Sequence, residues 1–163
     1  MASLLSFPNP VNEKAARVVA AGVLMLSLLA LIPGLTWLVL PIAIGFLLRV
    51  ASGPRFSPLG QLATKVVAPR LGAPRYVAGP PKRFAQAIGA TFTTAATIAY
   101  FGFGSVLIAG LLLVAIVIAA GLESGLGLCL GCVIFGWLMR VGLIADEICI
   151  ECNAVGLRYS QNG

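Results

Sequence analysis

The chain contains no histidine, and its 163 residues include only five acidic residues against 11 Lys and Arg. Histidine is the side chain that most often serves as a general base near neutral pH, and it is a common neutral metal ligand. Charged residues make up only 10% of the chain, apolar residues make up 60%, and the mean hydropathy is +1.03. A soluble domain usually has about a quarter charged residues. These shortages exclude an ordinary soluble enzyme and predict a protein whose solvent is largely lipid.

Four apolar runs have about the length that crosses a bilayer, and they cover residues 15–32, 35–50, 84–103 and 105–122. Spanning helices need roughly 17–25 such residues. Pro33-Gly34 separates the first two runs, and a glycine-containing turn separates the last two. Each pair of runs is therefore predicted to form a tight helical hairpin. A soluble helix pair would show a polar stripe along each helix, but the only charged residue within the first run is Arg17 and no such stripe is present in the first pair of runs. We therefore predict an all-α fold, a polytopic membrane helical bundle of two hairpins (four spans), in a single membrane domain 1–163.

The connector between the hairpins, residues 51–83, holds six of the ten prolines, six Lys or Arg and no acid. Ser57-Pro58 is typical of a helix start, and the apolar spacing after it predicts a short amphipathic helix in the headgroup region, ending before Pro69. The positive-inside rule places this basic connector and the N-terminus in the cytoplasm of a multi-pass plasma-membrane protein. Because the charge lies in a loop between spans and no recognition fold accompanies it, we expect the lipid bilayer and no nucleic acid as a partner.

The apolar character continues beyond the fourth run. A single helix over residues 105–141 would be about 55 Å long against a bilayer core of roughly 30 Å, so the helix must break or leave the membrane. We predict a span that ends near Glu123, followed by a short C-terminal helical element (residues 126–152) that is half-buried or re-entrant; a fifth short span is the alternative. Arg49 and Arg140 each close an apolar run, which is the usual place of an interfacial arginine.

The four cysteines form two CxxC pairs, Cys129/Cys132 and Cys149/Cys152, with 16 residues between them. Residues three apart share a helix face, so each pair can bring two sulfurs together for a disulfide or a metal. One interpretation is thiol–disulfide exchange or sulfur-atom transfer, because a CxxC at a helix start can have a lowered thiol pKa. The spacing also fits a four-thiolate zinc site or an iron–sulfur cluster, provided that the chain turns back at Gly142. The third interpretation is that the cysteines are small buried apolar residues without chemistry.

Glu123 is the only acid between Glu13 and Asp146. An ionisable group at membrane depth is by default a functional hypothesis, so Glu123 is a candidate intramembrane polar site for a proton, a cation or the proton of a thiol. The simpler reading is that Glu123 marks the interface where the fourth helix ends. The threonines and small residues of the third run favour close helix packing. Together with Glu123 they are the only support for a small-solute transporter.

Several segments of the sequence are distinctive: FPNPVNEKAARVVAAG, GPRFSPLGQLATKVVAPRL, GPPKRFAQAIG and LESGLGLCLGCVIFGWLMR. From Phe7 to Cys152 the chain resembles the bacterial membrane family catalogued as domain of unknown function 4395. The resemblance implies an integral membrane protein, often found alongside thioredoxin-like or sulfurtransferase proteins. It brings no established activity and no catalytic residues, although Cys129 and Cys132 match the family's CxGC phrase.

These observations favour an integral membrane component of thiol–disulfide or sulfur-relay chemistry. In this prediction Cys129/Cys132 is the inner pair, and Cys149/Cys152 is the pair that exchanges with a thioredoxin-like or sulfurtransferase protein. The alternative is a non-enzymatic structural or assembly subunit of a larger membrane complex, whose four cysteines bind zinc or an iron–sulfur cluster. Both an enzymatic and a non-enzymatic role therefore fit these residues.

Overall fold

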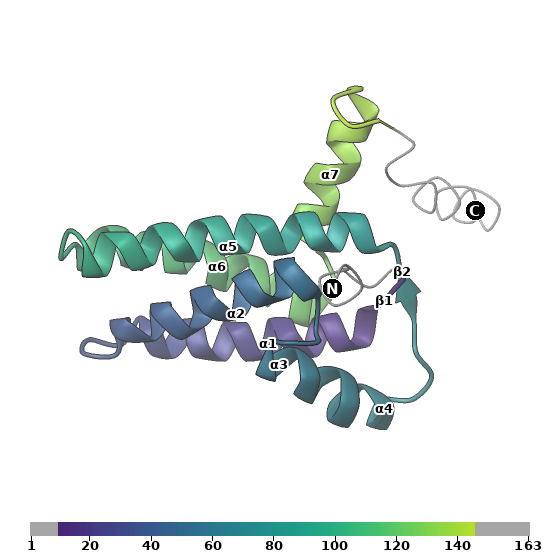
Figure 1. Ribbon diagram of the computed structural model, residues 1–163, viewed down its shortest axis with the longest axis horizontal. Coiled ribbons are helices and arrows are strands. Elements are labelled where there is room, and N and C mark those ends of the chain that lie inside the picture. Colours follow the sequence, from purple (N-terminus) through teal and green to yellow (C-terminus); the bar gives the residue numbers. More distant parts are fainter. Residues whose placement is uncertain (1–9, 146–163) are drawn as a thin grey trace.

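The computed structural model describes residues 10–145, and this part of the chain is mostly helical. Its long helices are α1 (Glu13–Ala30), α2 (Val39–Ser52), α5 (Gly79–Phe101) and α6 (Val106–Leu126). They run alongside one another as a bundle, and α7 (Leu130–Arg140) projects away from the bundle near the end opposite the hairpin tips (Figure 1). The predicted all-α class is confirmed.

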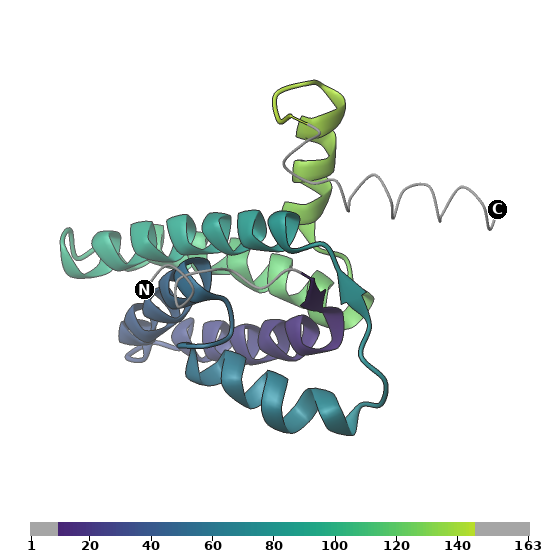
Figure 2. The same ribbon diagram turned by 45° about the vertical axis from the view of Figure 1, so that its right-hand side comes forward.

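The remaining elements are short. They are a 3-10 turn η1 (Thr36–Leu38), α3 (Pro58–Leu62), a π-helical turn η2 (Ala63–Val67), α4 (Ala68–Arg70), β1 (Val11–Asn12) and β2 (Tyr76–Val77). The two strands form an antiparallel bridge with Val11 opposite Val77. This bridge joins the residues just before α1 to the residues just before α5, so both hairpins begin at the same end of the bundle (Figure 2).

Local sequence signals set the ends of the helices. Asn12 caps α1, because its side chain accepts the backbone N–H of Lys14 at 3.0 Å. Ser105 caps α6 in the same way, accepting the N–H of Ile108 at 3.4 Å. The first hairpin turns at Gly34, whose φ of +89° is a left-handed conformation that favours glycine. The predicted turn at Pro33-Gly34 is therefore confirmed.

The two hairpins interlock instead of packing as separate units. α2 packs mainly on α5, and α1 packs mainly on α6. Gly89 of α5 makes the first of these contacts possible, because a Cβ there would lie 2.2 Å from Cε1 of Phe46. The hydroxyls of Thr93 and Thr97 donate to carbonyls of their own helix, at 2.7 Å to Gly89 and 2.8 Å to Thr93. The small-residue face of α5 thus serves helix packing, as the sequence predicts.

The connector helix differs from its prediction in extent. It does not end before Pro69 but continues through α3, η2 and α4 to Arg70. In the π-helical turn the N–H of Ala68 bonds to the carbonyl of Ala63, and Pro69 then stands in the first turn of α4, where no backbone donor is needed. The segment also lies against α1, since a Cβ at Gly22 would be 2.6 Å from Cδ1 of Leu59.

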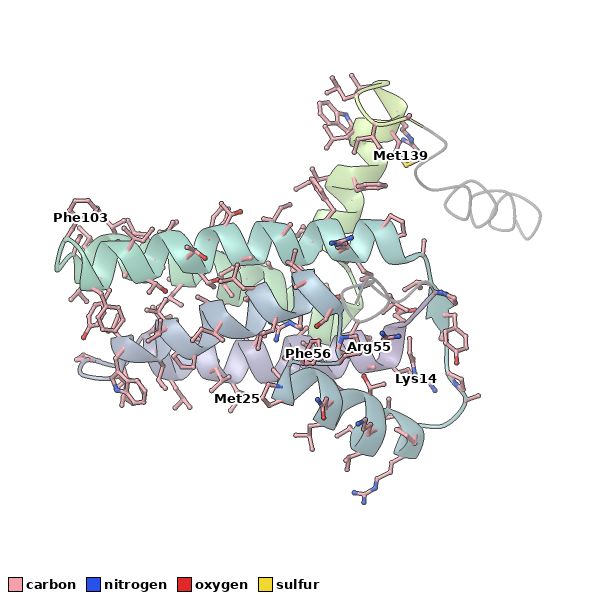
Figure 3. The ribbon with its side chains drawn as sticks, viewed as in Figure 1. Lys14, Met25, Arg55, Phe56, Phe103 and Met139 are labelled. Atoms are coloured by element: carbon pink, nitrogen blue, oxygen red, sulfur yellow. The ribbon has the colours of Figure 1, made fainter. Side chains whose placement is uncertain are left out.

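Among the described residues, α6 is the one helix long and apolar enough to span a membrane, with 21 residues and a mean hydropathy of 2.7. The other helices of the bundle are shorter, less apolar or charged at one end. Large apolar side chains nevertheless point outward along the bundle, with Met25 61% exposed on its side and Phe103 81% exposed at a hairpin tip (Figure 3). Lys14 lies at the opposite end from Phe103 (Figure 3).

Candidate functional site

The first cysteine pair lies where α6 gives way to α7. α6 ends at Leu126, and the next residue, Gly127, has a left-handed φ of +69° that reverses the chain. Cys129 is the N-cap of α7, and its Sγ accepts the backbone N–H of Cys132 at 3.4 Å. Both cysteines are free thiols. The structure therefore brings Cys129 and Cys132 together at a helix start, as the CxxC spacing predicts.

The glycine inside this CxxC pair holds α7 against α5. A Cβ at Gly131 would lie 2.4 Å from the Cα of Ala85, so only a residue without a side chain fits at this crossing. One turn further along α7, the ring of Phe135 packs on Phe84 with the ring centroids 5.6 Å apart. The outer part of α7 leaves the bundle, and Trp137 is 59% exposed there. The pair thus stands on the anchored end of a projecting helix.

The two thiols differ in acidity. A hydrogen bond from the Cys132 side chain lowers the pKa of Cys129; burial and the charge of Glu123 oppose this, and the charge of Lys82 supports it. The same hydrogen bond, followed by burial, raises the pKa of Cys132 far above its usual range. Cys129 is therefore the more acidic thiol of the pair.

We expect iodoacetamide to label Cys129 at a lower pH than Cys132. The thiolate is the reactive form, so a lowered pKa keeps Cys129 reactive as the pH falls, whereas a raised pKa delays the reaction of Cys132 to alkaline pH. The pH profile of each site is read from fragment ions after short labelling. In denaturant both profiles should converge near a pH of about 8.5, the ordinary value for a thiol. A native midpoint of Cys129 at or above that of Cys132 contradicts this assignment.

Glu123 lies inside α6, which continues through it to Leu126. Its Oε1 is 2.5 Å from Nζ of Lys82, in the first turn of α5, and the two side chains are only 14% and 8% exposed. Sequence reasoning missed Lys82, because its place in the basic connector predicts a solvated charge. The sequence does carry one indication of such a partner. Glu123 is isolated among apolar residues, and a buried lone carboxylate needs a cation to pair with. The sequence does not indicate which cation this is.

Arg17 is the one charged residue of the first apolar run, residues 15–32, and it binds the end of α6 that follows Glu123. Its guanidinium donates to the carbonyls of Ser124 at 3.2 Å and Gly125 at 3.0 Å. Carbonyls in the last turn of a helix have no partner within the helix, and a cation there also complements the helix dipole. Arg17 therefore fixes the C-terminal end of α6, which carries Glu123 and leads into Cys129.

Cys129 borders a cavity of about 260 Å³. Most of its lining is apolar and comes from all four bundle helices and α7; Gln86, Glu123 and Cys129 are its polar exceptions. Cys129 is 7% exposed, so its sulfur is shielded from bulk water. A thiolate formed here depends on its hydrogen bonds and on Lys82, not on hydration.

The four-cysteine metal site is a prediction that extends beyond the described residues. Within residues 10–145, no group of three or more Cys, Asp or Glu lies close enough to hold a metal ion. Cys149 and Cys152 lie outside the described residues. α7 ends at Arg140, and Gly142 has a left-handed φ of +81°; the return of the chain that a shared ion requires lies outside the described residues.

A family model described as Domain of unknown function (DUF4395) matches residues 11–140. The chain belongs to the DUF4395 family. No curated protein and no solved structure matches it. The DUF4395 match includes Lys82, Glu123 and the Cys129/Cys132 pair and ends before Cys149. The resemblance seen in the sequence is thus confirmed at the level of the family.

Proposed function

We propose that the protein is a multi-pass component of the plasma membrane in which α1, α2, α5 and α6 are the four spans. The outward-facing apolar side chains along the bundle support this arrangement. The hairpin tips at one end carry no charge, whereas Lys14 and the basic connector lie toward the other end. By the positive-inside rule the N-terminus and the connector are cytoplasmic.

We further propose that this component carries out thiol–disulfide or sulfur-relay chemistry. The observation that carries the proposal is the position of Cys129, whose Sγ caps α7 and accepts the N–H of Cys132. A helix start stabilises negative charge, and the second thiol of the pair stays protonated until it is needed. This asymmetry is what a dithiol requires when one sulfur attacks and the other resolves.

The proposed exchange has two steps. The thiolate of Cys129 attacks one sulfur of a disulfide, breaking its S–S bond and forming a mixed disulfide, while the displaced sulfur takes up a proton. Cys132 then loses its proton and attacks the sulfur of Cys129, which releases the second thiol and closes the Cys129–Cys132 disulfide. Two electrons pass from the pair to the disulfide. In a sulfur relay, the Cys129 thiolate takes the outer sulfur of a persulfide and leaves the donor as a thiol.

The burial of Cys129 favours an exchange within the chain. Cys129 is only 7% exposed, so it is poorly placed to meet a soluble protein directly. We therefore assign Cys149/Cys152 as the pair that meets a thioredoxin-like or sulfurtransferase partner and passes electrons to or from the inner pair. Glu123 lines the same cavity as Cys129, and its charge acts on both thiols, so we assign it as the carboxylate that accepts the proton of Cys132.

The test follows the inner disulfide during reduction by a thioredoxin. We expect the Cys129–Cys132 disulfide of the purified protein to be reduced at least tenfold more slowly in a Cys149→Ser/Cys152→Ser variant than in the unaltered chain, with the disulfide measured by the mass of trapped thiols. Dithiothreitol, a small dithiol that needs no relay, should reduce both proteins at similar rates. Thiol exchange that persists at the same rate in all Cys→Ser variants would overturn the proposal.

A structural subunit with a zinc ion or an iron–sulfur cluster is the second candidate, and the turn at Gly142 favours it. All four thiolates would then hold the metal and stabilise an assembly. Native mass spectrometry separates the two candidates. An excess mass that disappears on denaturation, with four thiols recovered, supports the metal, whereas a denatured mass lower by about 2 Da per S–S bond supports the disulfide relay.

A further inference from the structure

A second cavity, of about 460 Å³, lies between α1, the connector, the ends of the two strands and α5. Most of the side chains that line it are apolar or small. Among the described lining residues, Arg49 and Lys82 are cations and none is a carboxylate. Both cations are buried, with exposed fractions of 5% and 6%. The cavity is therefore an apolar space with positive charge in its wall.

Arg49 has bonding capacity that the described protein atoms do not use. Its Nε donates to Oε1 of Gln86 at 2.8 Å, and its Nη1 donates to Oγ of Ser57 at 3.2 Å. Its Nη2 is buried and has no hydrogen-bond partner among the described residues. The guanidinium also lies over the ring of Phe46, 4.5 Å from the centroid. These contacts fix the guanidinium and leave one nitrogen for another acceptor.

Arg49 also lacks a direct ion pair, although the charge of Glu123 acts on it from beyond contact distance. Lys82, the other cation of the cavity, is paired with Glu123, but no carboxylate of residues 10–145 lies within ion-pair distance of Arg49. A buried cation without a counter-charge is strongly unfavourable, so such groups are normally paired or bound to an anion. The partnerless Nη2 of Arg49, in a residue that lines the cavity, is a donor that an anion there would use.

We propose that this cavity binds an amphiphile with an apolar body and an anionic oxygen headgroup, a carboxylate or a phosphate, which pairs with Arg49. The volume of about 460 Å³ falls in the range of small-molecule sites, roughly 300–1,000 Å³, and is much larger than a phosphate ion alone requires. The apolar lining accommodates the body of the ligand, and the planar guanidinium suits both headgroups. This binding goes beyond the cysteine chemistry, although Gln86 lines both cavities and Lys82 also holds Glu123.

The test measures binding to the full-length protein in non-ionic detergent by titration calorimetry. We expect decanoate to bind, and decanol, its uncharged counterpart, to bind at least tenfold more weakly. Arg49→Gln should weaken decanoate binding at least tenfold. Arg70→Gln, the matched control, removes the same charge from an exposed connector residue that does not line the cavity and should leave binding unchanged.

A second variant keeps the test decisive if Arg49→Gln fails to fold. Thr64→Phe places a ring in the cavity without altering the hydrogen bonds of Arg49 and should abolish decanoate binding. Inorganic phosphate and phosphatidylglycerol in mixed micelles, titrated in parallel, distinguish a free oxyanion from a lipid headgroup as the natural source. Equal binding of decanoate and decanol, equal effects of Arg49→Gln and Arg70→Gln, or no binding of any of the three anions overturns the proposal.

Discussion

Replacing Gly131 by alanine is expected to separate α7 from α5 and to expose the Cys129/Cys132 pair. The added Cβ would meet the backbone of Ala85, at 2.4 Å from its Cα, and a helix backbone cannot move aside as a flexible side chain does. Overpacking of this kind costs about 1–3 kcal/mol, and a backbone clash belongs at the upper end of that range. Two measurements check this: the midpoint of unfolding in detergent, which should fall, and the rate of iodoacetamide labelling of Cys129, which should rise.

Gly136→Ala is the matched control on the same helix. A Cβ at Gly136 meets nothing within 4 Å, and the residue is exposed. Alanine is favoured over glycine in a helix by roughly 1 kcal/mol, so this variant should leave stability unchanged or raise it. If the two variants behave alike, the close approach of α7 to α5 is not what holds the cysteine pair in place.

Breaking the ion pair between Lys82 and Glu123 should have the largest effect on stability. Both side chains are buried, so Lys82→Met leaves the carboxylate without its counter-charge, and removal of one partner of a buried pair costs about 3–5 kcal/mol. The double variant Lys82→Met/Glu123→Leu removes both charges and should recover most of this loss. Equilibrium unfolding of the two single variants and the double variant in one detergent measures the coupling between the residues.

The other ion pair of the described chain is the control for this experiment. Nε of Arg75 lies 3.0 Å from Oε2 of Glu13, but the Arg75 side chain is 67% exposed. Exposed pairs are worth less than about 1 kcal/mol, so Arg75→Met should change stability little. Additive losses in the Lys82/Glu123 cycle, or equal losses for Lys82→Met and Arg75→Met, would contradict a buried and coupled pair.

The helices could be predicted from the sequence because their signals are local. Apolar runs mark their lengths, and the Pro33-Gly34 turn marks where the first hairpin reverses. The course of the connector was less predictable. Pro69 reads as a helix terminator, but the π-helical turn before it lets the helix continue to Arg70. The turn packs against α1, and a contact between segments so far apart in the chain is not shown by any local pattern.

The candidate site was predictable only where its residues are neighbours in the chain. The CxxC spacing placed Cys129 and Cys132 together, whereas the pairing of Glu123 with Lys82 joins α6 to α5 and depends on how the hairpins interlock. Arg49 illustrates the same limit. It ends an apolar run, which predicts an interfacial position, but the connector and α5 fold over it and bury it beside Ser57 and Gln86.

The bridge between β1 and β2 also sets an order of assembly. Val11 is synthesised before α1, but its partner Val77 follows only after α2 and the whole connector. A ribosome therefore releases the first hairpin while β1 is still unpaired, and the bridge forms only when the chain has reached the start of α5. Once formed, the bridge closes the first hairpin and the connector into one loop, so the start of α1 and the start of α5 are tied to each other.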